Sequence, residues 1–241
     1  NGVFGGKDKV LFRLDSEPDR DKFDLRLVYD APKDGVIAAL AGGQSDIRAR
    51  VFGKGGWSRW DGIAYATQDG RKLAAFQLGN RAGVYRLAGQ AWPGALLGGT
   101  ARLAVGDTLS LLYDGTFAAN AFDGRLRAAT ETFKMAADGK LDLAGNKAED
   151  IRLKARITRP ERLLETPQLA GVNIEARLDG AFSDLSIDHK VMIERLKFGT
   201  FDAQGLQTAG TATWDGKRFF LPLAVTARRV ATGNAMIDPR F

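Results

Sequence analysis

Alternation of apolar and polar residues with a period of two is the feature that most constrains the fold of this 241-residue chain. In residues 22–29, Phe, Leu, Leu and Tyr alternate with Lys, Asp, Arg and Val. Similar alternation recurs at 47–51, 151–158, 172–178 and 219–227. Successive side chains of a β-strand point to opposite faces, so each segment would present one apolar and one largely polar face. The pattern therefore predicts β-strands.

Asp-Gly dipeptides punctuate these segments, and such dipeptides are typical of hairpin turns. The close spacing of the turns favours antiparallel strands, because parallel crossovers need helices of about ten or more residues. We expect two short helices only, at 32–41 and at 160–164. The sequence thus predicts an all-β, antiparallel fold. The eight dipeptides begin at Asp34, Asp61, Asp69, Asp114, Asp123, Asp138, Asp179 and Asp215.

Composition excludes several classes of function. Hydrophobic residues make up 44% of the chain, enough for a folded core. The chain has no cysteine and a single histidine, His189, so thiol catalysis, zinc–thiolate sites, iron–sulfur clusters and multi-histidine metal sites are excluded. His189 alternates with Ile187 and Val191, which indicates a residue of the sheet without a catalytic role. Enzymes that need none of these groups are not excluded by composition.

The net charge of +6 raises the question of a nucleic-acid partner. The basic residues are spread singly along the strands among acidic neighbours, which favours a solvated sheet face over a nucleic-acid footprint. No apolar run approaches the 18 or so residues that a membrane helix needs. The chain begins at Asn1 without a signal peptide, so we expect a fragment whose anchor lies elsewhere.

The apolar stripe has two interpretations. About eighteen strands spaced by about 4.8 Å would form a sheet some 85 Å long, which is too long to stay flat and uncovered. The stripe could be the core of a sandwich or barrel. It could instead line an open trough for a hydrophobic ligand, since a strand of about seven residues runs roughly 23 Å, long enough for an acyl chain.

Other patterns carry little functional signal. Gly5, Gly6 and Lys7 lack the remainder of a phosphate-binding loop. Asp107 and Asp114 stand in turn-like contexts, so we interpret them as turn residues and not as a hydrolase pair. The tryptophans are more consistent with core or rim packing than with carbohydrate or nucleic-acid stacking. They are Trp57, Trp60, Trp92 and Trp214.

A weak internal similarity relates two stretches at an offset of 65 residues. Asp114 matches Asp179, and Gly115 and Phe117 match Gly180 and Phe182. A repeating β architecture would explain it. We expect a single elongated segment over 1–241, with a repeat at about 109–170 and 171–235.

Four segments carry a family resemblance, namely 23–40, 53–62, 176–182 and 212–228. In their order along the chain they resemble an internal, periplasmic part of the TamB branch of the AsmA-like (YdbH-related) repeating-β-groove proteins of Gram-negative bacteria. The resemblance implies a long antiparallel sheet curled into an elongated open groove, the β-taco. It also implies phospholipid transport between inner and outer membranes in support of outer-membrane biogenesis, an inner-membrane anchor elsewhere, and an outer-membrane insertase of the BamA/TamA type as partner. The family has no catalytic residue, so the resemblance implies no enzyme activity, no metal and no cofactor.

With this resemblance we expect the apolar stripe to bind phospholipid acyl chains, without involvement of nucleic acid. Two other functions stay open: a periplasmic scaffold that pairs outer-membrane β-barrel proteins with an exposed sheet edge, and a carbohydrate-binding or carbohydrate-cleaving β-protein. The expected groove residues are Phe23, Leu25, Leu27, Tyr29, Ile47, Val51, Ile63, Tyr65, Phe76, Leu78, Tyr85, Leu87, Leu103, Leu109, Leu111, Phe133, Leu141, Leu143, Ile151, Leu153, Ile157, Ile174, Leu178, Ile187, Val191, Phe198, Phe219, Leu221, Leu223 and Val225.

Overall fold

The computed structural model describes residues 2–4, 8–33, 45–95, 102, 105–162 and 168–234. The described chain divides into two compact units, residues 1–117 and 118–241. Each unit is described by itself below.

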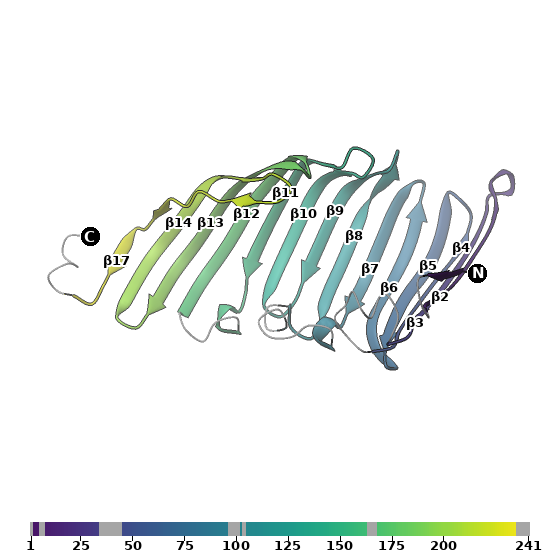
Figure 1. Cartoon of the computed structure of the whole chain (residues 1–241), viewed down its shortest axis with the longest axis horizontal. Helices are drawn as coiled ribbons and strands as arrows, with labels where there is room; N and C mark the ends of the chain where they lie inside the picture. Colours follow the sequence, from purple (N-terminus) through teal and green to yellow (C-terminus); the bar gives the residue numbers. More distant parts are fainter. Residues whose placement is uncertain are drawn as a thin grey trace. The chain divides into compact units, whose positions relative to one another are not determined.

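Unit 1 is an antiparallel sheet in which consecutive strands along the chain pair with each other (Figure 1). Two short 3-10 helices, η1 (Pro18–Arg20) and η2 (Pro93–Ala95), lie between strands. The strands are β1 (Gly2–Phe4), β2 (Asp8–Glu17), β3 (Lys22–Ala31), β4 (Ile47–Gly55), β5 (Arg59–Gln68), β6 (Arg71–Arg81), β7 (Val84–Ala91) and β8 (Leu109–Ala118).

Unit 2 repeats this construction with longer strands. Pro160–Arg162 forms a 3-10 helix, η3, at the start of the second predicted helix, whereas the first predicted helix, 32–41, lies largely outside the described residues. The strands are β9 (Ala121–Ala129), β10 (Phe133–Asp142), β11 (Lys147–Ile157), β12 (Gln168–Ala181), β13 (Asp184–Phe198), β14 (Phe201–Trp214), β15 (Phe219–Phe220), β16 (Val225–Thr226) and β17 (Arg229–Ala231).

Both sheets are open. Among the described strands of each unit, the first and the last do not pair, and no second sheet is stacked on the first. The predicted all-β, antiparallel, open sheet is therefore confirmed, and closure into a barrel is excluded. The core of a closed fold is replaced by a sheet whose apolar side chains are mostly half-buried.

The Asp-Gly dipeptides correct part of the turn prediction. Asp69 and Asp215 do lie at turns, and Asp34 lies outside the described residues. The other five dipeptides lie inside strands, because the strands are longer than the sequence pattern indicated. In each, the aspartate shares a sheet face with charged residues and the glycine takes a position on the apolar face. These five begin at Asp61 in β5, Asp114 in β8, Asp123 in β9, Asp138 in β10 and Asp179 in β12.

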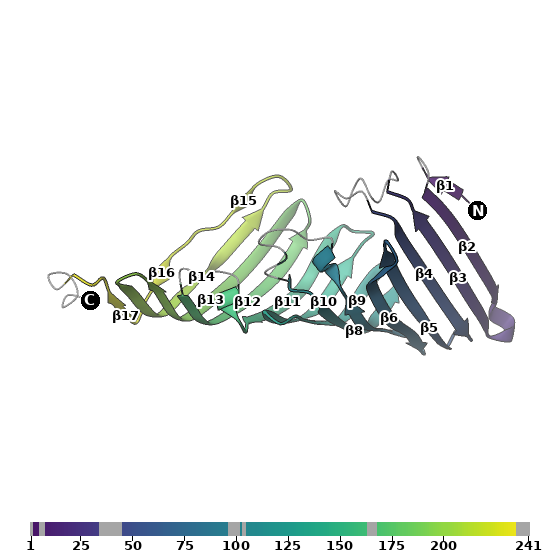
Figure 2. The same ribbon diagram turned by 90° about the horizontal axis from the view of Figure 1, so that it is seen from below.

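The last described strands of unit 2 form one interrupted edge strand. β15, β16 and β17 each pair with β14, and a single antiparallel register relates all three to it (Figure 2). The gap at 221–224 contains Pro222, which has no N–H to donate to a ladder and is tolerated mainly in edge strands. The segment therefore extends the sheet without a continuous ladder of hydrogen bonds.

Candidate functional site

Four cross-strand rows make up one face of unit 1, called here apolar face 1. Residues directly opposite each other in an antiparallel pair share a sheet face, so the register assigns each row without reference to side-chain type. No row contains a charged side chain. The rows, from β2 to β8, are Ser16, Phe23, Gly55, Trp60, Asn80, Tyr85, Gly115; Leu14, Leu25, Gly53, Gly62, Leu78, Leu87, Tyr113; Phe12, Leu27, Val51, Ala64, Phe76, Gly89, Leu111; and Val10, Tyr29, Ala49, Ala66, Ala74, Ala91, Leu109.

At one end of this face a carboxylate is buried beside a phenol. Asp8 is 0% exposed, and its Oδ2 accepts a hydrogen bond of 2.6 Å from the hydroxyl of Tyr29. Burial, followed by this hydrogen bond, raises the pKa of Tyr29 to about 12. The neutral phenol therefore satisfies one oxygen of the carboxylate, and Tyr29 adds no charge to the apolar face.

At the opposite end an aromatic cluster covers the first row. The ring of Phe23 stacks on Trp60 at 5.2 Å between centroids and meets the edge of Trp57 at 5.5 Å. Gly53 makes room for this arrangement: a Cβ there would lie 3.2 Å from Cε1 of Phe23 and 3.4 Å from Cε3 of Trp60. Trp57 and Trp60 thus pack at the rim of the sheet, consistent with the packing interpretation.

Two expected groove residues, Ile63 and Tyr65, lie on the other face of β5. Ile63 stands opposite Phe52 and Tyr65 opposite Arg50, whereas Ala64 faces the apolar side between Val51 and Phe76. The sequence misled here because β5 places its large residues on the polar face and Gly or Ala on the apolar face. These two residues are therefore removed from the expected groove.

Unit 2 has a corresponding face, apolar face 2, made of five rows that contain no charged side chain. Its polar members are His189 and Thr208; neither ring nitrogen of His189 has a hydrogen-bond partner among the described residues. The rows, from β9 or β10 to the edge strand, are Ala128, Met135, Ala155, Ile174, Val191, Thr208, Val225; Leu126, Ala137, Leu153, Ala176, His189, Gly210; Gly124, Gly139, Ile151, Leu178, Ile187, Ala212; Phe122, Leu141, Ala148, Gly180, Leu185, Trp214, Phe219; and Phe133, Ile157, Val172, Ile193, Leu206.

Apolar face 2 stays exposed at the edge strand. Phe219 is 55% exposed and Val225 is 61% exposed. Leu221 and Leu223 lie between them in the same register and are 38% and 65% exposed. Large apolar side chains that are exposed next to one another often mark a surface that binds a ligand, a protein or a membrane.

The reverse faces of both sheets carry ion pairs. Arg81 binds Asp61 at 2.6 Å in unit 1, and Lys140 binds Glu149 at 2.7 Å in unit 2. Such pairs lie in solvent and contribute little stability each, about 0–1 kcal/mol. Because the rows of the apolar faces contain no charged side chain and the ion pairs lie on the reverse faces, the apolar faces are the better surfaces for an apolar ligand.

The register places 25 of the 30 expected groove residues on the two apolar faces, counting Ile47 beside Ala31 at the end of face 1 and Leu221 and Leu223 by continuation of the register. Leu143 lies in a turn, Phe198 ends β13 at 60% exposure, and Leu103 is outside the described residues. Sequence reasoning missed Val10, Phe12 and Leu14, although their own alternation would have indicated them. Contact of any of these residues with lipid stays a prediction.

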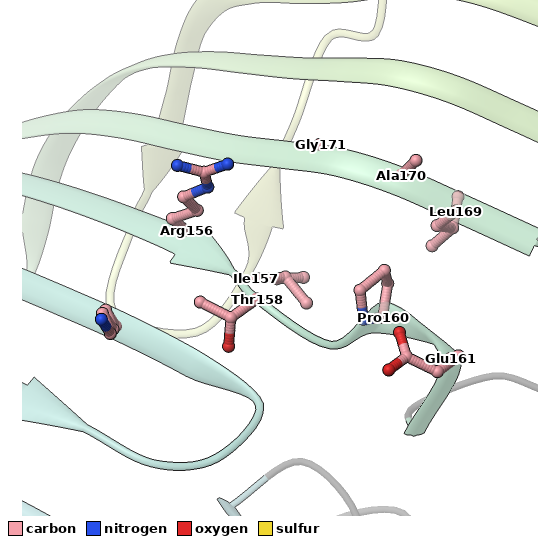
Figure 3. Close-up of a pocket in the computed structure, with 9 residues that line it drawn as sticks. Arg156, Ile157, Thr158, Pro160, Glu161, Leu169, Ala170 and Gly171 are labelled. Atoms are coloured by element: carbon pink, nitrogen blue, oxygen red, sulfur yellow. The ribbon is translucent and has the colours of Figure 1, made fainter.

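Two hollows lie away from the centres of the apolar faces. One, of about 540 Å³, lies mainly on the polar face of unit 1 over Gly79 and beside Arg81 and Arg86. The other, of about 360 Å³, lies in unit 2 where β11 ends and η3 begins (Figure 3). In the described part of the chain no group of three or more potential metal ligands occurs. None of the described helices is long and apolar enough to cross a membrane.

Comparison with known proteins gives no relative: no family model, no curated protein and no solved structure matches this chain.

Proposed function

We propose that this chain carries phospholipid along its apolar faces, as part of a bridge between the inner and outer membranes. The observation that supports this best is the absence of charged side chains from the rows of both faces, while the reverse faces hold the ion pairs. An acyl chain on these rows meets mostly apolar side chains and no charged group, and the headgroup can stay in water. The family resemblance adds the periplasmic setting and the outer-membrane partner to the proposal.

The mechanism is passive. Each CH₂ removed from water contributes about 0.8 kcal/mol, so a whole acyl chain binds well. A shift of the chain along rows of similar side chains exchanges one set of apolar contacts for another, and the free energy changes little. Small residues such as Ala64, Ala66 and Gly89 project little from the middle of face 1. A surface of shallow relief favours movement of the acyl chain along it over capture in a deep pocket.

The experiment is native mass spectrometry combined with lipid extraction of the purified protein. A triple variant, Leu25→Asp, Leu153→Asp and Leu223→Asp, places three charges on the apolar faces. A matched control, Ile63→Asp, Ala136→Asp and Ala209→Asp, places the same charge on the polar faces. Phospholipid should accompany the wild type and the control and be lost from the first variant, with all three folded by circular dichroism. A wild type without lipid, or a folded first variant that retains it, contradicts the proposal.

A scaffold for outer-membrane β-barrel proteins is the second candidate. β1 pairs only with Asp8–Val10, so residues 11–17 of β2 have no partner along that edge among the described residues. An unpaired edge is a template for strand addition. On this alternative, Arg13→Pro should abolish capture of an unfolded outer-membrane barrel protein while lipid binding persists. If the chain instead carries lipid, the triple Leu→Asp variant is the one that should lose function, because it loses lipid binding.

A further inference from the structure

Four pairs of cationic residues stand directly opposite each other on the polar faces. Directly opposed like charges destabilise a sheet. Three of these pairs have a compensating group beside them. Asp61 lies beside the pair Arg59 and Arg81, and Asp150 beside the pair Arg152 and Arg177. In the pair Arg13 and Arg26, the ring of Phe52 lies beneath Arg26.

The fourth pair, Lys134 with Arg156, has no such compensation. The two residues are opposite each other on β10 and β11, and no carboxylate of the described residues forms an ion pair with either. Both line the cavity of about 360 Å³ at the start of η3. Two cationic side chains that lie beside a cavity without a carboxylate partner attract an anion. Phosphate is an anion that two such side chains bind well.

The other walls of the cavity specify the rest of the ligand. Ile157, Pro160 and Leu169 form an apolar wall, and Ile157 also belongs to apolar face 2. Glu161 lines the cavity from η3, beyond Pro160 and away from Arg156 in Figure 3. The cavity therefore offers two cations, one carboxylate and an apolar wall that continues into the apolar face.

We propose that this cavity receives the headgroup of a zwitterionic aminophospholipid, with its phosphate on Lys134 and Arg156 and its ammonium group on Glu161. The acyl chains of that lipid then follow Ile157 onto apolar face 2. The inference rests on the proposed lipid-carrying function and adds a headgroup preference and a place where a lipid is held. Such a site would set the orientation in which a lipid enters or leaves the face.

The test is calorimetric titration of the full chain with monomeric short-chain lipids. The probes are dihexanoyl phosphatidylethanolamine, dihexanoyl phosphatidylglycerol, dihexanoylglycerol without phosphate, and inorganic phosphate. The double variant Lys134→Gln/Arg156→Gln should weaken phosphatidylethanolamine binding about tenfold or more, since hydrogen bonds to charged groups are the strong ones. Glu161→Gln should weaken phosphatidylethanolamine but leave phosphatidylglycerol binding unchanged.

The matched control is Arg13→Gln/Arg26→Gln, which removes a pair of the same geometry and charge from unit 1. This control should bind all probes as the wild type does. If Lys134→Gln/Arg156→Gln also binds as the wild type does while Leu153→Asp does not bind, the headgroup site is refuted and the lipid-carrying function stands. Equal binding of inorganic phosphate and of the lipid would refute it as well, because the apolar wall would then add nothing. If no lipid binds the wild type, both proposals fail.

Discussion

Single residues keep the two faces of each sheet distinct. The glycines inside β4 and β5 lie on apolar face 1, where a larger residue would displace an aromatic ring or a neighbouring strand. At Gly53 and Gly62 the effect is steric, so it differs from the conformational role of glycine in a turn. Gly53 is the clearest example because Phe23 lies over it between two tryptophan rings.

Gly53→Ala should destabilise the protein by about 1 kcal/mol, because the ring of Phe23 must move to admit a methyl group at 3.2 Å. Gly79→Ala is the matched control, since its Cβ would find only ordinary contacts of 3.5 Å or more on the polar face. That control should be neutral or slightly stabilising, by up to about 1 kcal/mol. Chemical denaturation and the near-ultraviolet circular dichroism of the tryptophans measure both. Equal effects of the two substitutions would show that the ring is not held tightly.

The Tyr29 phenol makes an alkaline prediction. Its pKa is about 12 in the folded chain against 10.0 for the ordinary side chain, so the folded state holds the proton more tightly. The resulting stabilisation is present below about pH 10 and is lost as the pH rises through about 12. Tyr29→Phe removes the hydrogen bond to Asp8 and should cost about 1–2 kcal/mol at pH 7.

Urea unfolding of the wild type and Tyr29→Phe at several pH values measures this effect. The stability difference between them should shrink from pH 10 upward. A difference that stays constant through pH 11 would contradict the assignment of the shift to the folded state.

At the scale of the strand, β-bulges keep the apolar residues before and after them on the same sheet face. The register of β11 shifts between Ala148 and Ile151, and both residues still lie on apolar face 2. Asp150 within this bulge has a φ of 48° and binds Arg152 at 2.5 Å and Arg177 at 2.6 Å. The irregular backbone thus brings a carboxylate to two arginines that oppose each other.

Asp150→Asn should lower the melting temperature at pH 7, because the asparagine keeps the left-handed conformation but removes the one carboxylate that binds both of the opposed arginines, Arg152 and Arg177. Although partial desolvation opposes ionisation, the hydrogen bonds from Arg177 and Arg152 hold the pKa of Asp150 below its usual value. The stabilisation is therefore present above the unfolded pKa and lost as the pH falls through the folded one. Thermal unfolding of both proteins between pH 7 and pH 2 should show the two curves converging in acid; parallel curves would contradict the ion-pair account.

The sequence predicts strands better than it predicts their ends. Alternation in 22–29 and 151–157 gives the correct face because both strands pair regularly with their neighbours over that length. Asp179 looked like a turn but lies in β12, since Asp-Gly also suits a strand that places a carboxylate on one face and a minimal side chain on the other. For Ile63 the sequence predicts the wrong face, because β5 places its large side chains on the polar face.

For the molecule as a whole, the central observation is that each unit presents several apolar rows without charged side chains, which its own sheet does not cover. Only long-range pairing reveals this: the rows unite residues from strands far apart in the sequence, such as Leu14 with Leu87. The cavity at η3 is likewise not predictable from the sequence, because Lys134 and Arg156 come together only through the pairing of β10 with β11. What sequence alone supplied was the alternation and the family resemblance.

The most direct test of the account is quenching of tryptophan fluorescence by a phospholipid with brominated acyl chains. One variant retains Trp214 alone, on apolar face 2; its control is a tryptophan-free chain with Ala209→Trp on the polar face of the same strand. Quenching should be strong at residue 214 and weak at residue 209. Equal quenching at both positions, or none at residue 214 while lipid is bound, would contradict the claim that acyl chains lie on the apolar face.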